Sequence, residues 1–140
     1  MVTIRTTGHP APAPLPVTPG GARRQLKVFL DGSTWCGDVD AVMLAVHEAM
    51  INSAYHGGGV VRVEASIEGE TLSVRVCDRG PGFTIPDSSR AGTATIDPLA
   101  EDGRGLWLIC QIASRAEVSR EGADFCLHLR FDAARDRGRR

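Results

Sequence analysis

The stretch that decides the fold is residues 38–82, which read DVDAVMLAVHEAMINSAYHGGGVVRVEASIEGETLSVRVCDRGPG. Its first half predicts a helix, because Asp38 is a suitable N-cap and apolar residues follow it at helical intervals. These apolar residues are Val39, Val42, Met43, Val46 and Met50. The three glycines at 57–59 should end the helix, because glycine is a poor helix former.

A hairpin and a long loop are expected next. Residues 60–67 and 71–77 are rich in β-branched side chains, and Glu68-Gly69-Glu70 between them suits a tight turn. From Asp78 to Gly105 the chain shows no sustained periodicity. Long loops within compact domains are often lids over a binding site. We therefore expect a lid here, with its polar part at 84–102 poorly ordered while the site is empty.

The flanking segments complete the pattern. A short helix is expected from about Ala22 to Leu30, ended by Gly32 and Ser33. A further helix should follow the lid, with apolar positions at Leu106, Ile109, Cys110 and Ala113, and strands are expected near 116–120 and 125–131. This order predicts an α+β fold. We expect a two-layer α/β sandwich in which helices cover one face of a mixed, mostly antiparallel sheet.

The two ends of the chain are expected to flank one domain. Residues 1–21 form a Pro-rich arm with five prolines between positions 10 and 19, residues 22–132 form the domain, and residues 133–140 form an Arg-rich tail. Residues 1–5 have the composition of an edge strand, but the prolines that follow argue against one.

Composition excludes several classes of protein. A chain of 140 residues with 42% apolar residues is long enough for one core, and a net charge of −1 gives no footprint for nucleic acid. No apolar run could cross a bilayer and no secretory signal is visible, so we expect a soluble, cytoplasmic protein. The cysteines lack Cys-x-x-Cys or zinc-type spacing, so we expect four reduced, unbridged thiols: Cys36, Cys77, Cys110 and Cys126.

Two polar residues stand out on the helix that begins after Asp38. Glu48 and Asn52 are four residues apart and share the face opposite the apolar stripe, where their neighbours are small or apolar. A helix covered on both sides would hold this carboxylate and amide against a partly enclosed space. The alternative is an ordinary exposed pair on a helix end that frays. His56, one turn further on, suits a helix-terminal cation better than a ligand.

Two glycine-containing segments are candidate binding turns. Asp78-Arg79-Gly80-Pro81-Gly82 combines close backbone approach with a carboxylate that can accept a hydrogen bond from an exocyclic amine such as that of adenine. Gly103-Arg104-Gly105-Leu106 precedes the expected apolar helix, where free N–H groups favour a phosphate. Each alone could be a plain turn, and neither a Walker motif nor a dinucleotide-binding fingerprint is present.

The three elements in this order resemble the GHKL superfamily: gyrase, heat-shock chaperone, histidine kinase and MutL ATP-binding domains. Residues 48–56 look like the N box, residues 78–82 like the G1 box and residues 103–108 like the G2 box. The compact size and the Gly-Arg-Gly-Leu-Trp-Leu-Ile run look most like the RsbW-type anti-sigma-factor serine kinases, over roughly residues 22–131.

The resemblance implies an ATP- and Mg²⁺-dependent protein serine/threonine kinase. It would phosphorylate a serine of an antagonist protein, an anti-anti-sigma factor of the STAS type, and would also bind a sigma factor, with homodimerisation left open. By this resemblance Glu48 is the general base, Asn52 holds Mg²⁺ and Asp78 recognises adenine. The remaining nucleotide-binding positions would be His56, Gly80, Gly82, Gly103, Arg104, Gly105 and Leu106.

One departure keeps other functions open. Members of the family often carry a Gly-Thr-Thr-like segment entering the last strand, whereas this chain has Gly122-Ala123-Asp124-Phe125-Cys126. A hydroxyl near the nucleotide would then be missing, which favours a non-catalytic nucleotide-binding module that sequesters a protein partner. A third alternative, the catalytic half of a split histidine kinase, would need a phosphoacceptor helix from another chain.

Overall fold

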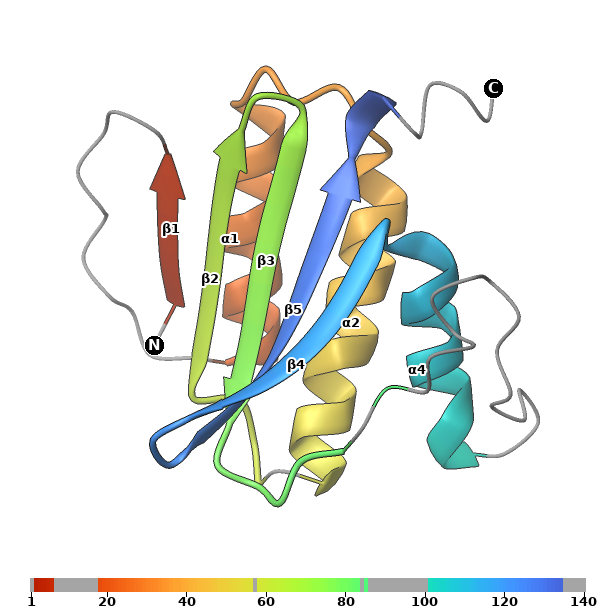
Figure 1. The fold of residues 1–140 in the computed structure, drawn as a ribbon. Helices are drawn as coiled ribbons and strands as arrows, with labels where there is room; N and C mark the ends of the chain where they lie inside the picture. The colour runs from red at the N-terminus through yellow and green to blue at the C-terminus, as the bar shows by residue number, and fades with distance from the viewer. Residues whose placement is uncertain (1, 7–17, 57, 84, 86–100, 135–140) are drawn as a thin grey trace.

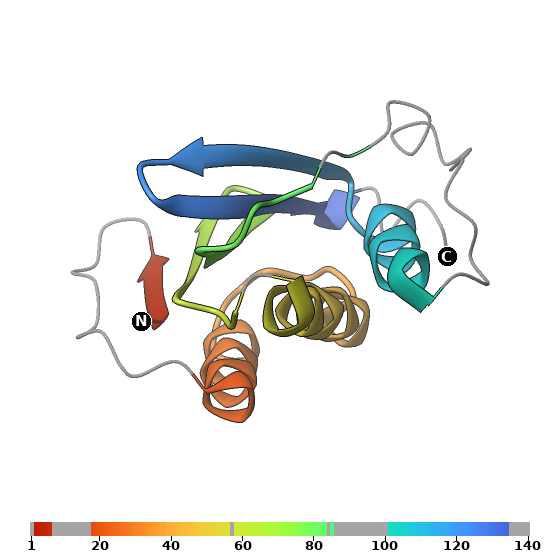
Figure 2. The same cartoon turned by 90° about the horizontal axis from the view of Figure 1, so that it is seen from below.

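The protein folds as two layers, a five-stranded sheet with helices on one of its faces (Figures 1 and 2). The computed structural model describes residues 2–6, 18–56, 58–83, 85 and 101–134 of the 140-residue chain. Seen end-on in Figure 2, helices α1 and α2 lie side by side beneath the sheet and α4 lies beyond α2. The expected two-layer α+β architecture is confirmed.

The helices are α1 (Pro19–Asp31), α2 (Val39–His56) and α4 (Glu101–Ile112). Helix α1 begins earlier than expected because Thr18 caps it: its Oγ1 accepts a hydrogen bond from the Gly21 N–H at 3.0 Å, and Pro19 suits the first turn. The predicted cap of α2 is confirmed, since Asp38 Oδ1 accepts from the Ala41 N–H at 3.1 Å. No helix in the described ranges is both long and apolar enough to cross a bilayer.

The sheet has the strand order β1-β2-β3-β5-β4. Its strands are β1 (Val2–Thr6), β2 (Arg62–Glu68), β3 (Thr71–Asp78), β4 (Arg115–Glu121) and β5 (Asp124–Asp132). All neighbours are antiparallel except β1, which pairs in parallel with β2. The edge strand suggested by the composition of residues 1–5 is therefore present, and the argument against it from the prolines was wrong. The prolines begin only after β1 ends, and an edge strand needs a partner on one side alone.

The core lies between the sheet and the helices. Alternate residues of β3 and β5, opposite each other in register, face the helices and are buried: Leu72 with Phe131, Val74 with Leu129, and Val76 with Leu127. The helices meet them with Leu26, Leu30, Val42, Val46 and Met50. The apolar stripe of α2 predicted from the sequence therefore packs on the sheet, which fixes the opposite face of α2 away from it.

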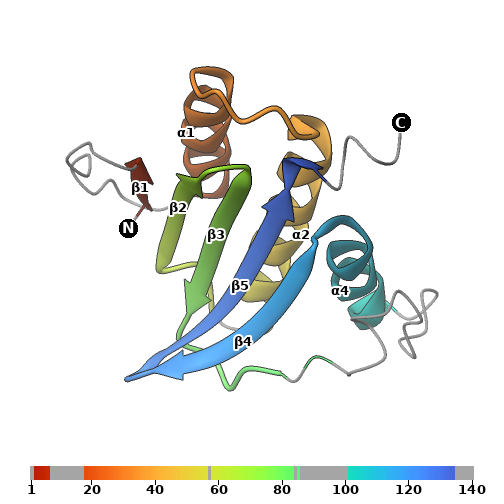
Figure 3. The ribbon, with the colours of Figure 1, turned by 45° about the horizontal axis from the view of Figure 1, so that its top comes forward.

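The other face of the sheet is polar and has no described helix over it (Figure 3). Side chains from β2, β3, β4 and β5 form a network of ion pairs there, which joins Arg62 and Arg75 to Glu64, Glu121 and Asp124. This face also carries a disulfide between Cys77 and Cys126. The expectation of four unbridged thiols is thus wrong. The two cysteines are 49 residues apart in sequence but directly opposite in the β3–β5 register.

Candidate functional site

Glu48 and Asn52 both point from α2 towards the beginning of α4. A Cβ built on Gly105 would lie 3.0 Å from Glu48 Oε2 and 3.3 Å from Asn52 Oδ1. Both side chains are half-buried, so they are not the freely exposed pair of the alternative interpretation. The carboxylate and the amide both lie against Gly105, so they share one face of α2, as their spacing on the helix predicts.

Helix α4 begins at Glu101, so the glycines at 103 and 105 lie inside its first turns and not before it. This corrects the sequence-based boundary. Packing explains it: a residue without Cβ at 105 lets α4 approach the polar face of α2 closely, and that contact stabilises a helix through two glycines that disfavour one. Gly103 and Arg104 lie in the first turn, where backbone N–H groups lack partners within the helix. Leu106 follows and is half-buried.

Asp78 is the last residue of β3 and is 6% exposed. Its Oδ1 accepts a hydrogen bond from the Gly80 N–H at 2.8 Å, which closes the turn that follows. In the β3–β5 register Asp78 lies opposite Phe125, on the face of the sheet that the helices cover. One carboxylate has room for several donors, so Asp78 can fix the turn and also accept from a ligand amine.

A cavity of about 530 Å³ lies beside this turn. It is lined by Pro81, Gly82, Phe83, Val118, Ser119, Arg120 and Phe125. The rings of Phe83 and Phe125 meet edge to face, with centroids 5.2 Å apart. Arg120 closes one side: its guanidinium lies 5.4 Å from the centre of the Phe125 ring and donates to the Gly80 carbonyl at 3.0 Å.

Phe83, Arg120 and Phe125 were missed by reasoning from the sequence. No local pattern separates them from other core or strand residues, because their nearness to Asp78 depends on how β3, β5 and β4 pair. Only a correct strand register would have identified them.

The predicted residues fall into two groups at one end of the molecule. Glu48, Asn52 and Gly105 form the first, while Asp78, Gly80 and Gly82 form the second. In Figure 1 the end of α2, the end of β3 and the start of α4 all lie at the lower edge. Neither Glu48 nor Asp78 lines the 530 Å³ cavity. His56 ends α2, and the expected lid falls mainly on residues 86–100, outside the described ranges.

A family model described as "Histidine kinase-like ATPase domain" matches residues 15–131. The chain belongs to this ATPase family. The match covers most of the chain, including both groups of predicted site residues, and confirms the expected GHKL-type ATP-binding domain.

A curated relative of this ATPase domain is the "Anti-sigma F factor" of Clostridium acetobutylicum. The two sequences are 32% identical over 89 residues, which cover 60% of this chain and 62% of the relative. This ATPase domain thus spans less than two thirds of that relative's length.

Solved structures agree on the fold. The catalytic domain of histidine kinase ThkA superposes with a TM-score of 0.54 at 11% identity, over 81% of this chain and 92% of that one. The Acinetobacter baumannii histidine kinase AdeS gives a TM-score of 0.50 at 14% identity, over 81% of this chain and 64% of that one. At these identities the likeness shows the fold alone.

The residues around Glu48 suit Mg²⁺ in their chemistry. Asn52 Oδ1 offers one oxygen ligand beside the Glu48 carboxylate, and Mg²⁺ takes few protein ligands and completes its shell with phosphate and water. A metal site made of protein ligands alone needs several His, Cys, Asp or Glu side chains close together. Among the described residues, such a cluster occurs on the opposite face of the sheet, at Cys77, Glu121 and Cys126. A metal at Asn52 would therefore depend on a bound triphosphate.

Proposed function

We propose that this domain is an ATP- and Mg²⁺-dependent protein serine/threonine kinase of the anti-sigma-factor type. The observation that carries the proposal is the position of Glu48 and Asn52 against Gly105, where a carboxylate and an amide oxygen face the start of a glycine-containing helix. The relative named as an anti-sigma F factor supports the same class of regulator. The domain would work in the cytoplasm.

The residues of the first group would handle the phosphates and the proton. Glu48 would accept the proton of the attacking serine hydroxyl, because its half-buried carboxylate lies close to the α4 helix start. Asn52 Oδ1 would be the protein ligand of Mg²⁺, whose charge would offset that of the phosphates. The free backbone N–H groups of the first turn of α4, which includes Gly103 and Arg104, would bind phosphate oxygens, with the helix dipole favouring the negative charge. Gly105 and Leu106 would line the nucleotide in the following turn.

The residues of the second group would recognise the base. Asp78 is buried at the end of β3 and retains acceptor capacity beyond its bond to Gly80, so it can receive the exocyclic amine of adenine. Gly80 and Gly82 would line the nucleotide with bare backbone, and His56 at the end of α2 would complete this side.

The macromolecular partners follow from the same proposal. The phosphoryl acceptor would be a serine of a STAS-type antagonist protein, and the competing partner would be a sigma factor. Transfer to the antagonist would then decide which of the two the domain holds, and the proposal leaves homodimerisation open.

A glutamate-to-glutamine change tests the proposal with little change in shape. Labelled Mg-ATP and the cognate antagonist should give phosphoserine with the wild type, and Glu48→Gln should lower the transfer rate by about a hundredfold or more, the usual contribution of a general base. Calorimetry should find nearly unchanged Mg-ATP affinity. Glu68→Gln, an exposed glutamate at the end of β2, is the matched control and should transfer normally. Normal transfer by Glu48→Gln would remove this residue from the mechanism.

A second candidate function, a non-catalytic nucleotide-binding module that sequesters its partner, is favoured by the segment that enters β5. Ala123 and Asp124 stand where family members often have threonines, and neither side chain carries a hydroxyl. The Asp124 carboxylate instead accepts from Arg62 Nη1 at 3.1 Å on the polar face of the sheet. Binding of Mg-ATP without transfer to any partner would select this function over the kinase.

A further inference from the structure

The cysteines of the disulfide lie next to the candidate adenine site along both strands. Cys77 immediately precedes Asp78, and Cys126 immediately follows Phe125. Because the two cysteines are opposite each other in register, with Cα atoms 4.1 Å apart, a bond between them joins β3 to β5 one residue from the Asp78–Phe125 pair. The bond therefore sits where the sheet passes into the turn at residues 78–82.

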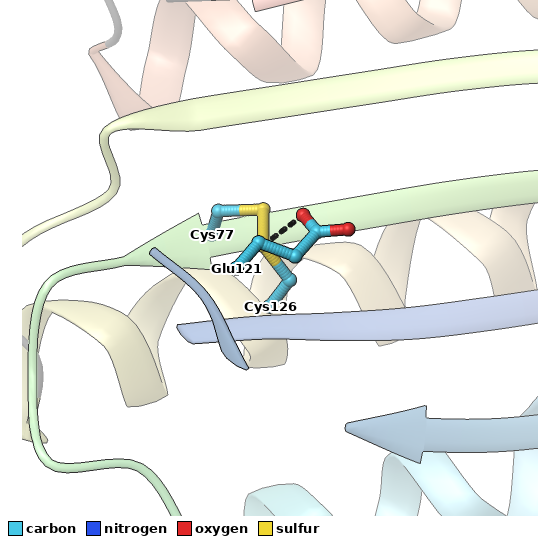
Figure 4. Close-up of side chains that lie close together, drawn as sticks. All are labelled: Cys77, Glu121 and Cys126. Atoms are coloured by element: carbon cyan, nitrogen blue, oxygen red, sulfur yellow. Dashed lines mark hydrogen bonds between the residues drawn. A yellow bond between two sulfur atoms is a disulfide. The ribbon is translucent and has the colours of Figure 1, made fainter. Parts of the chain in front are cut away.

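Both cysteines are buried, and the side chain of Glu121 lies beside their sulfurs (Figure 4). Cys77 and Cys126 are both 0% exposed, yet they face the side of the sheet that carries Arg62, Arg75 and Glu121. Those three side chains are 26%, 29% and 43% exposed. The side chains that lie over the sulfurs are thus themselves partly exposed to solvent.

Two guanidinium groups surround the sulfurs. Arg62 Nη2 lies 3.5 Å from Cys77 Sγ and 3.6 Å from Cys126 Sγ, and Arg75 Nη2 lies 3.9 Å from Cys126 Sγ. Positive charge beside a cysteine favours the thiolate, which is the form that attacks disulfides and is displaced from them. Arg62 and Arg75 thus place positive charge beside both sulfurs, and the Glu121 carboxylate that pairs with them offsets part of it.

The same cluster is a poor metal site. Glu121 Oε2 lies 3.4 Å from Cys126 Sγ, so two sulfurs and a carboxylate are close enough to bind one ion. That carboxylate, however, is already paired with both Arg62 and Arg75. A divalent cation would have to enter beside two positive charges and take the oxygen that neutralises them. Oxidation to a disulfide adds no charge and leaves these ion pairs in place.

We propose that Cys77 and Cys126 are a reversible oxidation site whose disulfide orders the turn at residues 78–82. The bond restrains the ends of β3 and β5, which holds Asp78 opposite Phe125 and Gly82 against its ring. The reduced strands separate more readily at this end of the sheet, and the turn loses order. The effect of the disulfide on nucleotide affinity rests on the proposed function, whereas its effect on the order of the turn does not.

The oxidation is a two-step thiol–disulfide exchange with a low-molecular-weight disulfide such as oxidised glutathione. The thiolate of one cysteine attacks a glutathione sulfur, forms a mixed disulfide and releases one reduced glutathione. The second cysteine, deprotonated, attacks the protein sulfur of that mixed disulfide and releases the other glutathione. Two S–H bonds are lost, one protein S–S bond forms, and the two electrons and two protons end on the two glutathione thiols.

The test compares the oxidised and reduced forms of the intact wild-type chain. Peptide mapping after oxidation by glutathione disulfide should find Cys77 linked to Cys126, and dithiothreitol should reverse it. Hydrogen exchange of the peptide covering residues 78–83 should be slower in the oxidised form by a factor on the order of five, the low end of coupling between neighbouring sites. Mg-ATP should bind the oxidised form more tightly by a similar factor.

Variants separate this site from the other cysteines. Cys36→Ser, at an exposed position, should respond to oxidation like the wild type. In Cys126→Ser, hydrogen exchange at residues 78–83 should be as fast as in the reduced wild type, whether or not oxidant is present. If Cys126→Ser fails to fold, the wild-type comparison decides alone.

Each outcome of the wild-type comparison has a clear reading. Failure of the 77–126 link to form in folded protein overturns the proposal, and so does a link that leaves exchange at residues 78–83 unchanged. Slower exchange with no nucleotide binding in either form supports the oxidation site and contradicts the proposed function instead.

Discussion

Gly82 rests directly on the ring of Phe125. A Cβ at Gly82 would lie 2.4 Å from Cδ2 and 2.5 Å from Cε2 of that ring, closer than any real contact, and Gly82 also has a φ of +80°. Only glycine meets both requirements. Because Phe125 is also the residue opposite Asp78, this contact joins the turn after β3 to the start of β5.

Alanine at position 82 should therefore destabilise the fold more than alanine at another positive-φ glycine. Gly122→Ala is the matched control, since Gly122 has a φ of +61° and nothing within 4 Å of its added Cβ. Backbone strain should cost each variant about 1–2 kcal/mol. Gly82→Ala should lose roughly a further 1–3 kcal/mol from overpacking against Phe125, measured by urea unfolding. Equal losses would show that the ring moves away without penalty.

Gly105 offers a functional test of the contact between α2 and α4. Alanine there would bring its Cβ to 3.0 Å from Glu48 Oε2, and the flexible carboxylate should shift. Displacing a catalytic group by about 1 Å can lower a rate by roughly a hundredfold. The rate of phosphoryl transfer should therefore fall strongly, while the melting temperature should change little. Gly20→Ala in α1, with an ordinary 3.5 Å contact, should leave transfer unchanged. Full transfer by Gly105→Ala would contradict a role for the carboxylate's position.

Trp35 lies in the segment between α1 and α2 and forms a hydrogen bond with the turn of the β2–β3 hairpin. It is 6% exposed, and its Nε1 donates to the Glu70 carbonyl at 2.9 Å. That carbonyl also accepts from the Ala133 N–H, so Trp35→Phe should cost only about 1 kcal/mol. Trp35→Ala should cost roughly 3–5 kcal/mol, because it also leaves a cavity. Chemical denaturation of both variants checks the difference, and a larger loss for phenylalanine than for alanine would refute this account.

His128 makes stability depend on pH. Burial, followed by the positive charge of Arg75, lowers its pKa from the ordinary 6.5, and Ser119 Oγ lies 2.7 Å from its Nε2. Glu121 and Glu117 act in the opposite direction without reversing the shift. The unfolded chain then binds more protons, so the contribution of His128 is complete above pH 6.5 and is lost as pH falls from there through the lowered pKa.

Unfolding free energies measured at about pH 7.5 and pH 5.5 should show this loss in the wild type. His128→Gln removes the titrating group and should show a smaller drop over the same interval. A drop of the same size in both proteins would assign the pH dependence to other groups.

Glu121 covers and partly neutralises the surroundings of the disulfide. Glu121→Ala should speed reduction of the Cys77–Cys126 bond by glutathione, because it opens access and leaves two guanidinium groups to attract the thiolate. Glu117→Ala is the control: this residue is on the same strand but pairs with Arg115. Alkylation followed by mass spectrometry gives both rates. Slower reduction in Glu121→Ala would mean that this side chain assists the exchange.

Local patterns in the sequence determined the elements whose identity depends on neighbours in the chain. The apolar stripe and cap of α2, and the hairpin turn at Gly69, were predicted correctly because helical periodicity and turn chemistry act over a few residues. The spacing of Glu48 and Asn52 likewise fixed that they share one face. The order of these segments was enough to predict an ATP-binding domain of the GHKL type, which the family match confirms.

Tertiary structure alone decided which helices pack together and which residues of neighbouring strands lie opposite each other. The start of α4 at Glu101 depends on packing of Gly105 against α2, and β1 exists because β2 offers it an edge. The disulfide and the Asp78–Phe125 pair both follow from the register of β3 with β5, strands separated by nearly fifty residues. No periodicity within either strand encodes that register, since it is set by how both strands bury alternate side chains against the same helices.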